Sequence, residues 1–139
     1  MIFALAACGE SAAPAEAPAA EPAAAEPAAA EPAPVAEDAQ LVGVSMPTKD
    51  LQRWNQDGEN MKNMLEAAGY AVDLQFGAND IATQVSQLEN MIANGAKVLV
   101  ISAIDGDSLG TVLAQAKENG VPVIAYDRLI MNSDAVSYY

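Results

Sequence analysis

The sequence predicts an α/β fold, a three-layer α/β/α sandwich with a parallel sheet, preceded by a disordered linker. Three observations support this prediction. From Leu41 onward, short β-like runs alternate with helical runs, which is the pattern of βαβ units. The glycines that end the expected helices, Gly69, Gly95 and Gly120, recur 26 and 25 residues apart. The run 98–101 is apolar at every position, which requires helices on both faces of its sheet.

The first expected strand, 41–46, is apolar and is bounded by Pro47. A helix follows and ends at Gly69, because apolar and small residues recur at steps of three and four. These residues are Leu51, Trp54, Gly58, Met61, Leu65 and Ala68. Residues 70–76 then alternate as a half-exposed strand.

Asp80 is placed to cap the second helix, which ends at Gly95. The residues expected on its apolar face are Ile81, Val85, Leu88 and Ile92. The third strand is 98–101, and Asp107 or Ser108 is expected to cap the third helix. The fourth strand is 121–126, and a fifth strand is expected around 137–139.

The first forty residues have a different composition from the rest. They contain seven acidic residues and no lysine or arginine, so the net charge of −13 divides into −7 for 1–40 and −6 for 41–139. Prolines recurring every five residues in 22–32 block a continuous helix, and no large side chain is available to form a core. We therefore expect 9–40 to be a disordered acidic Ala/Pro linker.

The single cysteine lies in the run Leu5-Ala6-Ala7-Cys8. This run resembles the lipobox of bacterial lipoproteins, in which the cysteine is acylated. The resemblance implies that 1–8 is a lipoprotein signal, clipped because no positively charged segment precedes it, and that Cys8 anchors the chain to a membrane. The alternative is a chance apolar start with an idle cysteine.

Composition excludes several classes of function. The chain has no histidine and one cysteine, so neither a histidine-based triad nor a thiolate metal cluster can form within it. Glycine-rich dinucleotide and phosphate loops are absent, and so is a basic patch for nucleic acid. Asp105 and Asp127 are a conceivable acid pair, but loop carboxylates that cap helices or bind hydroxyls are the favoured interpretation. We expect no catalytic residues, no metal and no cofactor.

Charged and aromatic side chains follow three of the expected strands. They are Lys49, Arg53 and Trp54 after the first, Asp105 after the third, and Asp127 and Arg128 after the fourth. Because the carboxyl ends of parallel strands meet at one edge, these side chains converge there. Carboxylates accept from neighbouring hydroxyls, guanidinium groups donate to them, and an indole can cover an apolar ring face. This combination suits a neutral sugar. A core role for Trp54 and a surface ion pair for Asp127 and Arg128 remain open alternatives.

Residues 41–139 closely resemble the N-terminal lobe of bacterial periplasmic sugar-binding proteins of ABC importers, in the multiple-monosaccharide-binding branch near the xylose- and ribose-binding proteins. The resemblance is carried by 45–49 with Arg53-Trp54, by 87–92, by 97–101 and above all by 124–130. It implies a type I periplasmic-binding-protein lobe, incomplete here. It also implies that Asp127 and Arg128 contact sugar hydroxyls, as do Arg53 and Lys49.

The resemblance further implies a non-enzymatic, extracytoplasmic solute-binding lipoprotein. Its partners would be an aldopentose or aldohexose, an ABC permease and the membrane that holds its lipid, and not nucleic acid. We expect 41–139 to be a partial N-terminal sugar-binding lobe, because the second lobe and the hinge strands of such proteins have no counterpart in the sequence. The alternatives are the effector domain of a sugar-responsive transcription regulator and a signalling receptor of the same fold.

Overall fold

The computed structural model describes residues 39–131 and 133–138. The signal expected in 1–8, the lipidated Cys8 and nearly all of the linker expected in 9–40 therefore lie outside the described residues. Within the described part of the chain, no helix is both long and apolar enough to cross a membrane.

The described chain alternates strands with helices. In order, the elements are β1 (Leu41–Met46), α1 (Gln52–Ala67), β2 (Ala71–Phe76), α2 (Ile81–Ala93), β3 (Val98–Ile101), the 3-10 turn η1 (Asp107–Leu109), α3 (Gly110–Glu118), β4 (Val123–Ala125) and β5 (Val136–Tyr138). Gly69, Gly95 and Gly120 follow the three helices with φ of 90°, 86° and 69°. Glycine adopts this left-handed conformation without a Cβ clash, so the prediction that these residues end the helices is confirmed.

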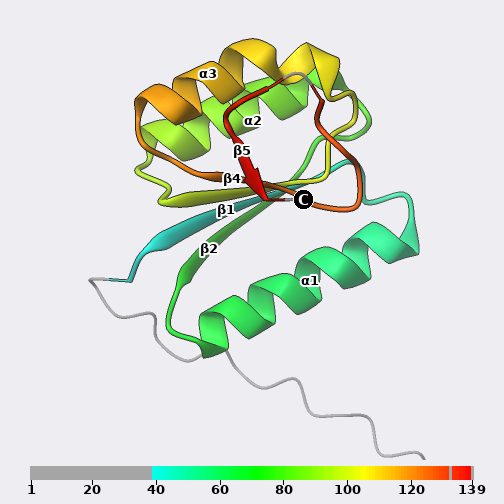
Figure 1. The fold of residues 1–139 in the computed structure, drawn as a ribbon. Coiled ribbons are helices and arrows are strands. Elements are labelled where there is room, and N and C mark those ends of the chain that lie inside the picture. The colour runs from blue at the N-terminus through cyan, green and yellow to red at the C-terminus, as the bar shows by residue number, and fades with distance from the viewer. Residues whose placement is uncertain (1–38, 132, 139) are drawn as a thin grey trace, which may run out of the picture. The chain divides into compact units, whose positions relative to one another are not determined.

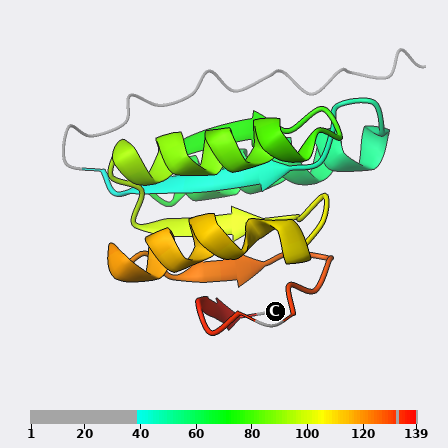
Figure 2. The ribbon, with the colours of Figure 1, turned by 90° about the horizontal axis from the view of Figure 1, so that it is seen from above.

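The strands form one sheet in the order β2-β1-β3-β4-β5, and every neighbouring pair is parallel. Figure 1 shows α2 and α3 on one face of the sheet and α1 on the other. Figure 2 shows β1, β3, β4 and β5 lying side by side in that order. The prediction of a three-layer α/β/α sandwich with a parallel sheet is confirmed.

Each face of the sheet has its own apolar core. The core facing α1 consists of Val42, Val44, Met46, Trp54 and Val100. The core facing α2 and α3 is larger and includes Leu88, Met91, Leu99, Ile101 and Leu113. Strand residues therefore alternate between the two cores, as the two-residue period of a strand requires.

Three local expectations differ from the structure. Asp107 and Ser108 do not cap α3, because the chain first makes the turn η1 and α3 has no side-chain cap at its start. Ile81 was expected on the apolar face of α2 but is 36% exposed, and Gln84 is buried instead. β4 covers only Val123–Ala125 of the expected 121–126. The cap at Asp80 is confirmed, since its carboxylate accepts a hydrogen bond from the N–H of Thr83 (2.7 Å).

Candidate functional site

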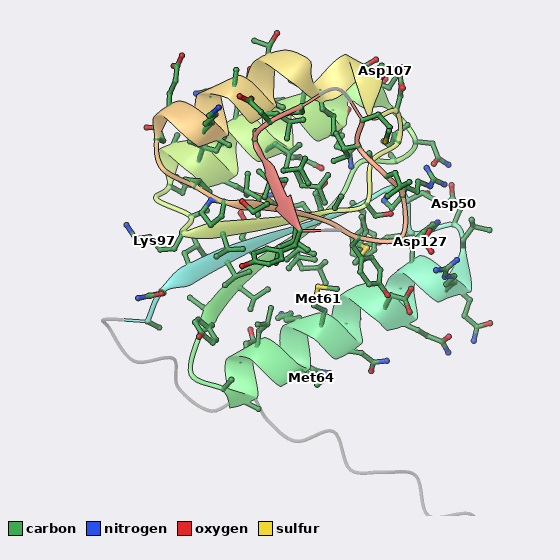
Figure 3. All side chains as sticks on the ribbon, viewed as in Figure 1. Asp50, Met61, Met64, Lys97, Asp107 and Asp127 are labelled. Carbon is green, nitrogen blue, oxygen red and sulfur yellow. The ribbon has the colours of Figure 1, made fainter. Side chains whose placement is uncertain are left out.

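The candidate site lies at the carboxyl edge of the sheet. β1, β3 and β4 are parallel neighbours, so the loops that follow them leave the sheet on the same side. In Figure 3, Asp50 and Asp127 lie at this end of the molecule, and Lys97, which precedes β3, lies at the opposite end. Ligands of open α/β sheets bind at the carboxyl end, which makes this edge the first place to look for function.

The first turn of α1 departs from the usual start of a helix. Its N-cap, Leu51, makes no side-chain capping hydrogen bond, and the first turn has no acidic residue. Arg53 instead places a cation there, where the helix dipole favours an anion. Departures of this kind from local rules are expected at functional positions. This turn therefore holds Arg53 and Trp54 at the edge of the sheet at some cost to the helix.

Arg53 and Asp127 meet although they are 74 positions apart in the sequence. Nη2 of Arg53 pairs with Oδ1 of Asp127, and its Nε lies 3.4 Å from Oδ2 of Asp57. The hydrogen bond and charge of Asp127 raise the pKa of the Arg53 guanidinium above its ordinary value. The Arg53 side chain is 59% exposed, so solvent screens both pairs and they contribute little to stability. They fix the direction of the guanidinium at the rim.

Asp127 sits in a left-handed turn two residues beyond the end of β4. Its φ is 61°, and the N–H of Arg128 donates to the carbonyl of Tyr126 (2.6 Å) across it. A hydrogen bond spanning a single residue with positive φ marks a tight, strained turn. The turn directs two adjacent side chains to different partners, Asp127 to Arg53 and Arg128 to the loop after β3.

Arg128 is held by the backbone of that loop and by the tryptophan. Its Nη1 donates to the carbonyl of Ala103 (2.9 Å) and, at longer range, to that of Ile104 (3.5 Å). Its Cζ lies 5.3 Å from the ring centroid of Trp54, and the Cζ of Arg53 lies 4.8 Å from the same centroid. Trp54 is only 4% exposed and belongs to the core facing α1. The core role of Trp54 is therefore observed, and its ring supports both guanidinium groups.

Tyr126 and Asp57 belong to the same region and were not among the candidates from the sequence. Burial raises the pKa of the Tyr126 hydroxyl, and the Asp57 carboxylate raises it further. Tyr126 faces the α1 side of the sheet, where it packs against the core that contains Trp54. Asp57 follows Arg53 by one helical turn, so the i,i+4 spacing of opposite charges could have indicated the pair.

Lys49 and Asp105 have local partners instead. The Nζ of Lys49 lies 4.9 Å from the ring centroid of Phe76, at the end of the edge strand β2. A hollow of about 390 Å³ opens there, lined by Thr48, Lys49, Asp50, Gln75, Phe76 and Gln87 among others. The carboxylate of Asp105 accepts from the N–H of Asp107 (3.2 Å) and from the hydroxyl of Ser108, both in η1. Asp105 and Asp127 thus have separate partners, which gives no support to an acid pair.

A buried glutamine on α2, Gln84, connects to this edge and was missed in the sequence. It is fully buried and hydrogen-bonds to Ser45 of β1 and to the backbone of Ser102 and Ile104 beyond β3. Its spacing from the buried Leu88 and Met91, at i+4 and i+7, places it on the apolar stripe of the helix. A glutamine on such a stripe was the available signal.

Chemically, the rim presents donors and acceptors side by side. The guanidinium groups of Arg53 and Arg128 donate, and the carboxylate of Asp127 accepts. Among residues 39–131 and 133–138, no group of three or more acidic or thiol side chains is arranged to hold a metal ion. An arrangement of this kind suits a ligand with several hydroxyl groups and does not require a charged one.

Comparison with known proteins gives a consistent family. Residues 42–139 match the family described as "periplasmic binding protein domain". The chain is 56% identical over 104 residues to the multiple sugar-binding periplasmic receptor ChvE of Rhizobium radiobacter, and 53% identical over 105 residues to the multiple sugar-binding periplasmic protein SbpA of Azospirillum brasilense. These matches cover 75% and 76% of this chain, but 29% of each relative, so the chain spans less than a third of their length.

Solved structures agree. An ABC transporter solute-binding protein from Clostridium phytofermentans with bound β-D-glucose is 74% identical, with a TM-score of 0.70 over 71% of this chain and 31% of that one. A carbohydrate transporter solute-binding protein from Chloroflexus aurantiacus in complex with D-glucose is 41% identical, with a TM-score of 0.65 over 71% and 30% of the two chains. From the family match over 42–139 and these relatives, the chain belongs to the periplasmic binding protein family.

Proposed function

We propose that residues 41–139 form one wall of a monosaccharide site in an extracytoplasmic solute-binding protein that is not an enzyme. The observation that carries the proposal is the cluster at the carboxyl rim, where Arg53 pairs with Asp127 and Arg128 is fixed beside them over Trp54. Relatives named as multiple sugar-binding proteins and neighbours with bound glucose support the same ligand class. We propose an aldopentose or an aldohexose as the ligand.

The roles we assign differ between residues. Asp127 accepts hydrogen bonds from neighbouring hydroxyls, and Arg128 and Arg53 donate to hydroxyl oxygens. Trp54 holds both guanidinium groups from the core side of the cluster. Because its ring is buried, we assign it this supporting role and not direct stacking on the sugar. Lys49 and Asp105 flank the cluster at the same edge, and we propose that they take part only at its periphery.

The second wall of the site would come from the part of the relatives that this chain does not span. The partner would be an ABC permease, because several structural neighbours are described as solute-binding proteins of ABC transporters. A signalling role is the second candidate. A neighbour at 25% identity and a TM-score of 0.61 is the fructose-binding periplasmic domain of a hybrid two-component system.

The binding test uses a hybrid in which 42–139 replace the matching segment of the Azospirillum brasilense protein. Calorimetric titration with D-glucose and D-xylose should show binding. Arg128→Ala in this hybrid should weaken it at least tenfold, about 1.4 kcal/mol or more. Lys97→Ala is the matched control, because Lys97 is an exposed cation at the opposite end of the sheet. A hybrid that binds neither sugar, or an Arg128→Ala variant with unchanged affinity, would refute the proposal.

We also propose that Cys8 carries the lipid that attaches the protein to the outer side of a bacterial cell membrane. The support is the run Leu5-Ala6-Ala7-Cys8 followed by an acidic Ala/Pro stretch long enough to act as a spacer. With a complete lipoprotein signal placed ahead of Leu5, expression in bacteria fed an alkyne-bearing fatty acid should label the protein and not its Cys8→Ser variant. Equal labelling of both would reject the anchor and leave the sugar site unaffected.

A further inference from the structure

We infer that Gln84 positions Arg128 for the ligand, although Gln84 lies on α2 and does not reach the rim itself. The inference rests on the proposed function of Arg128 in binding a sugar. The buried amide of Gln84, on the opposite face of the sheet from Trp54, would set the orientation of that arginine. The link between them is the backbone of residues 102–104, which follows β3.

Gln84 takes the place of a missing strand partner beyond the end of β3. Beyond β3, the N–H of Ser102 still bonds to the carbonyl of Ser45 (2.9 Å), and then the chain leaves the sheet. Nε2 of Gln84 donates to the carbonyl of Ser102 (3.1 Å) and to the hydroxyl of Ser45 (3.0 Å). Its Oε1 accepts from the N–H of Ile104 (2.9 Å). These backbone groups lie where the ladder of β3 stops, and buried ones need a partner.

The same backbone segment holds Arg128. Nη1 of Arg128 donates to the carbonyl of Ala103 (2.9 Å) and lies 3.5 Å from that of Ile104. Gln84 therefore bonds two successive peptide groups. One joins Ser102 to Ala103, and the other joins Ala103 to Ile104 and carries the carbonyl that accepts from Arg128. The direction in which those carbonyls point is fixed by the amide, because each peptide group is planar and its N–H and C=O are opposed.

Gly77 packs closely against both Gln84 and Ile104. A Cβ at this position would lie 2.9 Å from Cδ1 of Ile104 and 3.1 Å from Cβ of Gln84. Gly77 is buried and lies against both the Ile104 side chain and the start of the Gln84 side chain. The direct link between Gln84 and Ile104 is the hydrogen bond to Oε1, and Gly77 leaves no space beside either residue for a larger side chain.

A double-mutant cycle separates positioning from a general effect on stability. Gln84→Met keeps nearly the same length and removes all three hydrogen bonds. In the hybrid described above, we expect it to raise the Kd for the bound sugar about tenfold when Arg128 is present. In an Arg128→Ala background it should raise the Kd less than twofold. The loss of stability in urea should be the same in both backgrounds. Equal effects on Kd in the two backgrounds would overturn the inference.

Gln87→Met is the matched control. Gln87 lies on the same helix and makes a similar amide bond, from its Nε2 to the carbonyl of Phe76 (3.0 Å) at the end of β2. This bond leads to the edge strand and not to 102–104, so its loss should change the Kd less than twofold. If Gln84→Met unfolds the protein, Gln84→Asn, which keeps a shorter amide, takes its place in the same cycle with the same criterion.

A second readout does not depend on sugar. Trp54 is the only tryptophan of the sequence, and it lies on the α1 face of the sheet beneath Arg128. In the 139-residue chain, Gln84→Met should shift the Trp54 emission in the same direction as Arg128→Ala, and the double variant should shift it no further. If these emission effects hold but the hybrid binds no sugar, the proposed function fails and the positioning role stands. If sugar binds but the effects add in both assays, the positioning role alone fails.

Discussion

Asp127 has two separable roles, one in its backbone and one in its carboxylate. Its φ of 61° lies in the left-handed region, and its carboxylate pairs with Arg53. Three substitutions separate these roles. Asp127→Gly and Asp127→Ala both remove the carboxylate, but only glycine adopts the turn without a Cβ clash. Asp127→Asn keeps a side chain that tolerates this conformation and removes the charge.

The expected difference in stability follows from two opposing terms. An alanine held in the left-handed region costs roughly 1–2 kcal/mol. A glycine loses about 0.5–1 kcal/mol more conformational entropy on folding than an alanine does. We therefore expect Asp127→Gly to be more stable than Asp127→Ala by roughly 0.5–1 kcal/mol. Sugar affinity should not differ between these two variants. Both lack the carboxylate, so the Kd for the sugar should rise by about the same factor in each, about tenfold or more.

Urea unfolding followed by circular dichroism measures the first quantity, and calorimetric titration of the hybrid measures the second. Asp127→Asn should unfold close to the unmodified protein while binding sugar more weakly, since a charged acceptor is replaced by a neutral one. Equal unfolding free energies for the glycine and alanine variants would refute the strained turn. Retained affinity in Asp127→Gly would refute the contact between the carboxylate and the ligand.

Two further predictions concern the scaffold. Gly43→Ala should lower the free energy of unfolding by about 1–3 kcal/mol, because the added Cβ would lie 2.7 Å from Cδ2 of Leu99 and 2.8 Å from Sδ of Met91. Gly110→Ala is its control and should stabilise α3 modestly, since no heavy atom lies within 4 Å of the new Cβ; equal destabilisation of both would disprove the packing argument. Asp80→Ala should lower the urea midpoint near neutral pH, whereas Asp80→Asn should largely keep the cap. The hydrogen bond from Thr83 holds the pKa of Asp80 below its ordinary value of 3.8, so the stabilisation is present above that pH and is lost as pH falls through the lowered pKa. A pH series in urea in which the difference between Asp80 and Asp80→Ala persisted unchanged to pH 2 would contradict this assignment.

Hydrophobic period and glycine placement were sufficient to predict the sandwich and most of its elements. β1 covers the expected 41–46, and the three helices end before Gly69, Gly95 and Gly120 as expected. The errors lie where the chain changes direction. Asp107 lies in the turn η1 ahead of α3 and donates its N–H to Asp105, and periodicity carries no information on such a turn.

The site was predictable to the extent that parallel strands bring their carboxyl ends together. This rule correctly placed Arg53 beside Asp127 and located Arg128 in the same cluster. It did not foresee that Lys49 would lie over Phe76, because the conformation of the loop after β1 decides that contact. The place of Gln84 on the apolar stripe of α2 was a signal in the sequence, but its role was not predictable, because that role depends on backbone groups of 102–104 that lose their ladder partners only in the folded chain.

The pair between Arg53 and Asp127 joins segments 74 positions apart. During synthesis, α1 leaves the ribosome before β4 does. Until β4 has followed, the nascent chain lacks the pair between Arg53 and Asp127, whatever secondary structure it has formed. Contacts so distant in sequence form slowly, since a long loop must close first. Under the proposed function, a sugar would bind only molecules in which β4 has docked, and by mass action it would draw late-folding intermediates toward completion.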